Sequence, residues 1–133
     1  MSIESDILGS YHVIAVVGLS PNPERTSHHV CSYLKDQGYR IIPVNPTTDE
    51  ALGEQCYPDL LSVPHDVEVV QVFRRAEDVM PIVEQAIQIG AKAIWMQEGI
   101  VNEEAALKAR QAGILVVMDR CMLKEHMGLK GGS

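Results

Sequence analysis

Four of the six arginines in the chain follow apolar, β-branched segments. They are Arg25, Arg74, Arg75 and Arg120. A guanidinium can hold a phosphate through two parallel hydrogen bonds, so arginine is typical of phosphate sites. If the apolar segments are parallel strands, all four side chains lie at one edge of one sheet. The pattern then predicts a pocket for an anionic, phosphate-bearing ligand. The alternative is that they are ordinary surface arginines at the starts of loops.

The loop after the first apolar segment carries further groups suited to an anion. Gly18 is the one glycine where a dinucleotide-binding loop has three, and it allows close approach of the backbone. Ser20 and Asn22 offer hydrogen-bonding side chains in place of the missing glycines. Ser27 is expected to cap the following helix, whose N-terminus adds backbone N–H donors.

The second apolar segment ends in Val44-Asn45-Pro46. Folds that bind NAD usually have an aspartate or glutamate at this point, which holds the ribose hydroxyls. An amide is a poorer acceptor than a carboxylate, and Pro46 stiffens the chain. This position therefore argues against NAD.

Composition excludes several other classes of function. The net charge is −7, whereas a general nucleic-acid-binding surface requires a basic field. No apolar run is long enough to span a membrane, and the acidic N-terminal residues do not resemble a signal peptide. The three cysteines form no zinc-binding pattern, which favours the reducing cytoplasm and no metal site. Nothing in the sequence selects a monomer or an oligomer.

Strand and helix patterns alternate along the chain and must position these residues. The expected strands span residues 12–18, 40–44, 67–73, 93–97 and 114–118. The expected helices span residues 27–37, 77–89, 105–111 and 121–127, with a short one near 59–62. This order predicts a single-domain α/β fold: an open, doubly wound, mostly parallel five-stranded sheet with helices on both faces. We expect its core to span residues 12–127 and residues 128–133 to form a loose tail.

Five blocks of sequence, in this order, resemble one family. They are VGLSPNP (residues 17–23), IPVNP (42–46), LGEQCYP (52–58), VFRR (72–75) and VMDRCM (117–122). They look like the small stand-alone CoA-binding proteins of bacteria and archaea, which are similar to the CoA-binding domain of the succinyl-CoA synthetase alpha subunit. The resemblance implies a Rossmann-like fold and coenzyme A as the bound small molecule.

The resemblance also implies which residues contact the ligand. The nucleotide phosphates would meet Gly18, Ser20, Pro21, Asn22, Arg25, Thr26 and Ser27. The adenosine side would be lined by Val44, Asn45 and Pro46, with Phe73 and Arg74 flanking the ligand along its length. The pantetheine arm would lie near Gln97, Glu98 and Gly99.

The sequence favours binding over catalysis. No equivalent of the phosphorylated histidine of the synthetases is visible, so ligase activity is not implied, and we assign no catalytic residue. We expect a non-catalytic or regulatory CoA-binding protein. One alternative is an enzyme that handles acyl-CoA, with Glu98 as a base or Cys121 as a reactive thiol. The other is an NAD(P)-responsive redox-sensing module.

The cysteines are expected to be packing residues in the first instance. Cys31 and His28 are three residues apart on one helix, where a nucleophile–base pair is conceivable. A small, buried, apolar role for Cys31 is the favoured interpretation. Cys121 could instead form a mixed disulfide with the CoA thiol.

Overall fold

The computed structural model, which describes residues 2–131, contains one parallel sheet of five strands. The strands are β1 (Val13–Val17), β2 (Arg40–Val44), β5 (Val69–Val72), β6 (Ala93–Met96) and β7 (Leu115–Val117). Their spatial order is β2-β1-β5-β6-β7, with every neighbouring pair parallel. The expected α/β, doubly wound, Rossmann-like fold is therefore confirmed. The connection after β1 leads to β2 on one side, and the connection after β5 leads to β6 on the other, so a switch point lies between β1 and β5, where such folds bind ligands.

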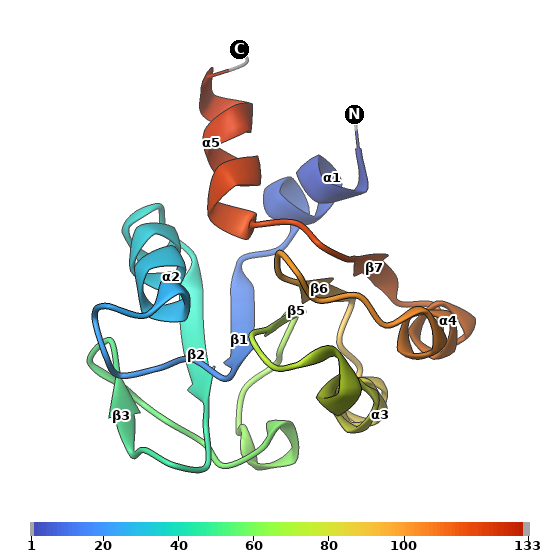
Figure 1. Cartoon of the computed structure of the whole chain (residues 1–133), viewed down its shortest axis with the longest axis horizontal. Helices are drawn as coiled ribbons and strands as arrows, with labels where there is room; N and C mark the ends of the chain where they lie inside the picture. Colours follow the sequence, from blue (N-terminus) through green and yellow to red (C-terminus); the bar gives the residue numbers. More distant parts are fainter. Residues whose placement is uncertain (1, 132–133) are drawn as a thin grey trace.

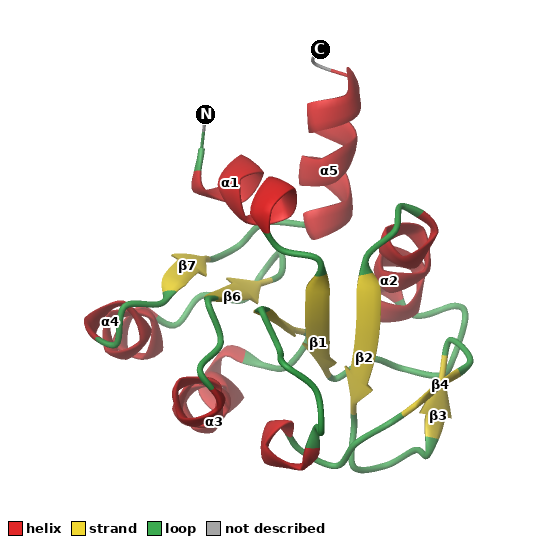
Figure 2. Ribbon diagram, turned by 180° about the vertical axis from the view of Figure 1, so that it is seen from behind, coloured by secondary structure: helices red, strands yellow, loops and turns green. Residues whose placement is uncertain are grey.

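Five α-helices accompany the sheet, with two short 3₁₀ turns. The helices are α1 (Ile3–Ser10), α2 (Thr26–Asp36), α3 (Val79–Ile89), α4 (Glu103–Gln111) and α5 (Met122–Gly131). The turns are η1 (Leu60–Ser62) and η2 (Ala76–Asp78). Helices α1, α2 and α5 lie on one face of the sheet, and α3 and α4 cover the other (Figures 1 and 2).

Alternation along the strands builds a hydrophobic core on each face. In β1, Ile14 and Val16 pack toward α1, α2 and α5, whereas Ala15 and Val17 pack toward α3 and α4. Both faces are covered, which is why the strands are apolar along nearly their whole length. Pro43 has no N–H to donate, and β2 carries it at the edge of the sheet, as its position in the sequence suggested.

Two elements were not expected from the sequence. Helix α1 begins with a reciprocal cap between Ser2 and Ser5, and it buries Ile7 and Leu8 in the core. A small antiparallel pair, β3 (Glu50–Ala51) with β4 (Glu54–Gln55), interrupts the long connection after β2. Each is too short to produce a clear periodic pattern.

The end of the chain also differs from the expectation. Helix α5 continues to Gly131, beyond the end expected near residue 127. A glycine within a helix costs only about 1 kcal/mol relative to alanine, so Gly128 does not end it. Residues 132 and 133 of the expected tail lie outside the described part of the chain.

Candidate ligand-binding site

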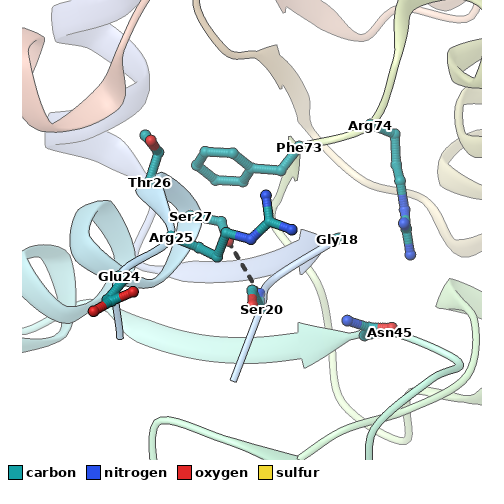
Figure 3. Close-up of a pocket in the computed structure, with 9 residues that line it drawn as sticks. All are labelled: Gly18, Ser20, Glu24, Arg25, Thr26, Ser27, Asn45, Phe73 and Arg74. Carbon is teal, nitrogen blue, oxygen red and sulfur yellow. Dashed lines mark hydrogen bonds between the residues drawn. The ribbon is translucent and has the colours of Figure 1, made fainter. Parts of the chain in front are cut away.

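A cleft opens where β1, β2 and β5 end, at the switch point of the sheet. Its volume is about 590 Å³, within the range of small-molecule sites. We call it the central cleft; it is lined by Gly18, Ser20, Glu24, Arg25, Thr26, Ser27, Asn45, Phe73 and Arg74 (Figure 3). Eight of these nine residues were predicted from the sequence, and Glu24 was not.

Gly18 is required by the close packing of β1 against β5. Its φ is +95°, and a Cβ atom added there would lie 2.5 Å from the carbonyl oxygen of Phe73. The same Cβ would lie 3.3 Å from Nε of Arg74. Gly18 therefore lets the loop pass beneath the Arg74 side chain, at the floor of the central cleft.

The loop after Gly18 is held by its own side chains. The backbone N–H of Ser20 donates to Oγ of Ser27 at 3.0 Å, the bond drawn in Figure 3. Oγ of Ser20 accepts from the N–H of Asn22, and Oδ1 of Asn22 accepts from the N–H of Glu24. Ser27 thus ties the loop to the helix, and it is not the helix cap that we expected.

The N-terminus of α2 is left open toward the central cleft. The N-cap residue is Arg25, whose side chain makes no capping hydrogen bond, and the first turn contains no acidic residue. The first backbone bond of the helix is from His29 to Arg25, so the N–H groups of Thr26, Ser27 and His28 come before it. By contrast, Asn102 caps α4, and two glutamates follow it. An open helix N-terminus of this kind favours a bound anion.

Two of the four predicted arginines line the central cleft. Figure 3 shows the Arg25 guanidinium between the Phe73 ring and Ser20, and the Arg74 side chain on the other side of Gly18. Among the described residues, neither guanidinium forms an ion pair with a carboxylate. Figure 3 also shows Glu24 on the side of the cleft away from Arg74. The two arginines are therefore available to an anionic ligand.

The other two predicted arginines pair with acidic residues of the chain. Arg75 is bound by Glu77 and Asp78, both at 3.2 Å. Arg120 donates to the carbonyl of Asp119 and lies 3.8 Å from Glu4 in α1, an element that the sequence did not predict. The proposed arginine cluster is thus reduced to Arg25 and Arg74.

Asn45 is a structural clamp as well as a lining residue. Its Nδ2 donates to the carbonyl of Leu19, and its Oδ1 accepts from both the N–H and the hydroxyl of Thr47. The buried amide thereby joins the loops after β1 and β2. Since Oδ1 and one N–H of Nδ2 are used within the chain, Asn45 shapes the site more than it offers groups to a ligand.

A second, more apolar cleft adjoins the central one and extends toward α3. We call it the Pro58 cleft; it is lined by Val17, Val44, Pro46, Thr47, Pro58, Asp59, Leu60, Arg74, Asp78, Ile82 and Gln85. Val44 and Pro46 were predicted from the sequence. The part contributed by η1 and α3 was missed, because these side chains come from segments far from the strand ends. Apolar walls with one guanidinium suit a flat heterocycle.

A third cleft lies on the other side of the central one. We call it the Cys121 cleft; it is lined by Thr26, Phe73, Arg74, Arg75, Gln97, Glu98, Ile100 and Cys121. Gln97 and Glu98 were predicted here, and Thr26 and Phe73 are shared with the central cleft. Arg74 lines all three clefts.

Three of the predicted site residues do not line these clefts. Pro21 and Asn22 lie in the exposed turn before α2, and Asn22 is used in supporting that turn. Gly99 donates its N–H to Oδ1 of Asp119 at 2.7 Å. Glu98 lines the Cys121 cleft but is bound by Lys124, whose pKa this hydrogen bond raises. Glu98 is therefore an ion-pair partner in an exposed position and a poor general base.

Neither a metal site nor a membrane span is formed by the described residues. Within that part of the chain, no three His, Cys, Asp or Glu side chains gather in a way that could hold a metal ion. No helix among residues 2–131 is both long and apolar enough to cross a bilayer.

Comparisons with known proteins identify the fold and the family of the chain. The chain is 44% identical over 121 residues to protein YneT of Bacillus subtilis (strain 168), covering 91% of this chain and 90% of that one. A hypothetical protein from Pyrococcus horikoshii OT3 has a solved structure with a TM-score of 0.94 and 44% identity, covering 98% of this chain and 94% of that one. The acetate–CoA ligase (ADP-forming) II of Archaeoglobus fulgidus is 30% identical over 93 residues, which are 68% of this chain and 14% of the ligase. The model of the CoA binding domain family matches residues 12–127, and the chain belongs to that family.

Proposed function

We propose that the chain binds coenzyme A in the central cleft, with a non-catalytic or regulatory role. The observation that carries this proposal is the uncapped N-terminus of α2 beside two arginines that have no carboxylate partner within residues 2–131. A pyrophosphate supplies the negative charge that both features favour. In a chain of net charge −7, this local concentration of donors and positive charge favours an anionic ligand.

The three adjoining clefts fit the three parts of the molecule. The phosphates would occupy the central cleft, between Arg25 and Arg74. The adenine ring would lie in the apolar Pro58 cleft, and the pantetheine arm would extend along Phe73 into the Cys121 cleft. Arg74 lines all three and would contact the ligand near its middle. The name of the Archaeoglobus relative, a CoA ligase, supports this choice of ligand.

NAD and acyl-CoA chemistry are less well supported. The Asn45 amide is occupied by Leu19 and Thr47, so the position that would hold the ribose of NAD is not free. Glu98 is exposed and paired with Lys124. The three free cysteines suit a reducing compartment such as the cytoplasm.

Comparative titration tests the proposal. Purified protein, shown by mass spectrometry to carry no ligand, is titrated calorimetrically with CoA, dephospho-CoA and NAD under reducing conditions. We expect micromolar or tighter binding of CoA, weaker binding of dephospho-CoA and much weaker binding of NAD. Tighter binding of NAD than of CoA would contradict the proposal, as would the absence of any CoA binding.

A further inference from the structure

Cys121 is the one cysteine of the chain that lines any of the three clefts. Its side chain is at the inner wall of the Cys121 cleft, and the residue is 8% exposed. Cys31 is fully buried against Gln71, and Cys56 packs into the core below the β3–β4 pair. All three are free thiols. Only Cys121 is thus placed where a molecule in the clefts could reach it.

The loop that carries Cys121 is held in place by hydrogen bonds. Trp95, in β6, donates from Nε1 to the carbonyl of Arg120 at 2.9 Å. Asp119 has a φ of +58° and accepts the N–H of Gly99. Helix α5 begins immediately after Cys121, whose carbonyl accepts from the N–H of Glu125. Cys121 therefore directly precedes the first residue of a helix.

A second observation at the same cleft indicates a ligand. Gln97 is 4% exposed and lines the cleft, and its Nε2 has no hydrogen-bond partner among the described residues. A buried amide donor without a partner costs about 1–3 kcal/mol. A ligand carbonyl that reaches Nε2 from the cleft would remove that cost. The pantetheine arm of CoA has two amide carbonyls and ends in a thiol.

We propose that Cys121 is a site of reversible covalent attachment for CoA supplied as its disulfide. This inference rests on the proposed function, because it needs the pantetheine arm in the Cys121 cleft. The Cys121 thiolate attacks one sulfur of the symmetric CoA disulfide, and the sulfur–sulfur bond of that molecule breaks. A new bond joins Cys121 to one CoA, and the other CoA leaves as a thiolate that takes up a proton. No net oxidation occurs, since one disulfide replaces another.

The chain would then hold CoA in two ways, reversibly as the thiol and covalently after exchange. Excess thiol reverses the step by the same exchange, so the attachment responds to the ratio of CoA disulfide to CoA thiol. Binding in the clefts would make the reaction selective, because a bound disulfide reacts as if within the same molecule.

The test uses the intact protein and the symmetric CoA disulfide. After incubation without reductant, intact mass spectrometry is expected to show one CoA per chain, and non-reducing peptide mapping is expected to place it on Cys121. Dithiothreitol should release it. Glutathione disulfide, which lacks the nucleotide, should label the protein at least about tenfold more slowly, and added adenosine 3′,5′-bisphosphate, which has the nucleotide but no thiol, should compete.

Variants supply the controls. Cys121→Ser should show no adduct. Cys56→Ser should keep it, because Cys56 does not line the three clefts, and its equal exposure of 8% makes it a matched control. Peptide mapping of the wild-type protein identifies the modified thiol even if a variant folds poorly. An adduct on Cys31 or Cys56, or equal rates with glutathione disulfide, would overturn the inference.

Calorimetry under reducing conditions separates this inference from the proposed function. If CoA binds reversibly but no adduct forms on Cys121, the covalent step is wrong and the binding proposal stands. If CoA does not bind at all, both are wrong.

Discussion

Two constraints require glycine at position 18, its positive φ and the close approach of Phe73, and mutation can separate them. Gly18→Ala places a Cβ 2.5 Å from a backbone oxygen at a φ of +95°. Gly113→Ala, at a φ of +83° with nothing within 4 Å, introduces the backbone strain alone. Such strain costs about 1–3 kcal/mol, so we expect Gly113→Ala to lose that amount and Gly18→Ala distinctly more. Urea denaturation measures both, and equal losses would mean that the close approach to Phe73 is unimportant.

Arg74 is the residue on which the proposed CoA site most depends. Because Arg74 lines all three clefts and pairs with no carboxylate of the described residues, Arg74→Ala should weaken CoA binding by about 1.5–3 kcal/mol, roughly ten- to a hundredfold. Arg110→Ala removes the same charge from α4, outside these clefts, and should change the affinity little. Calorimetric titration of both variants checks this. An Arg74→Ala variant that binds CoA as tightly as the wild type would remove Arg74 from the site.

Cys31 makes the stability of the fold sensitive to alkaline pH. Burial raises the pKa of its thiol well above the ordinary value of 9.0. The unfolded chain therefore releases this proton at a pH where the folded chain keeps it, and the free energy of unfolding falls as the pH rises past 9. Burial likewise raises the pKa values of Cys56 and Tyr39, which adds to the fall.

Removing the thiol tests that linkage. Between about pH 8 and about pH 10, the Cys31 thiol should account for a loss of roughly 1 kcal/mol. Cys31→Ala should show a correspondingly shallower fall in urea denaturation, whatever its stability at neutral pH. An unchanged pH dependence would show that the thiol of Cys31 does not keep its proton in the folded chain.

Among the helices, the N-terminus of α4 is built for stability, whereas the N-terminus of α2 is left free to bind a ligand. Helix α4 is completed by Asn102, whereas α2 is left without a cap at Arg25. Arg25→Asp should supply that cap and raise the free energy of unfolding by about 1 kcal/mol. It should also reduce CoA binding more than Arg25→Ala does, because the added carboxylate would take up the free N–H groups of the helix and repel the phosphates of CoA.

Both quantities are measured on the same two variants, by urea denaturation and calorimetry. Opposite changes in stability and affinity are the expected result. A variant that gains stability and keeps its affinity for CoA would show that the N-terminus of α2 is not where the phosphates bind.

The elements with a strong local pattern were predictable, and the others were not. The five strands were found because each is a short, mostly apolar run rich in β-branched residues, and α3 because its apolar residues repeat at helical spacing. Helix α1 is short, and its stability comes from tertiary contacts such as the bond from the Tyr39 hydroxyl to Leu8. The β3–β4 pair has only two residues in each strand. Neither leaves a periodic signal that sequence alone can show.

For the whole molecule, the order of the parallel strands was the feature from which the position of the site could best be predicted. Parallel strands bring Gly18, Asn45 and Phe73 together although they are far apart in sequence. The sequence therefore predicted most of the central cleft. It did not predict that Arg120 pairs with Glu4, which approaches through the unpredicted α1, or that Arg75 pairs with its sequence neighbours Glu77 and Asp78. It also missed the far wall of the Pro58 cleft, which depends on how η1 and α3 pack.

CoA is proposed to occupy the sheet edge that these strand ends form. The most direct test is a backbone amide footprint by NMR, recorded with and without CoA. We predict that the perturbed amides cluster at residues 18–28, 45–47, 73–75 and 97–98. A separate hollow at the edge of β2, lined by Arg40, Tyr57 and His65 among others, should remain unchanged. Saturating CoA that perturbs this β2 hollow but leaves the amides of residues 18–28 in place would contradict the account.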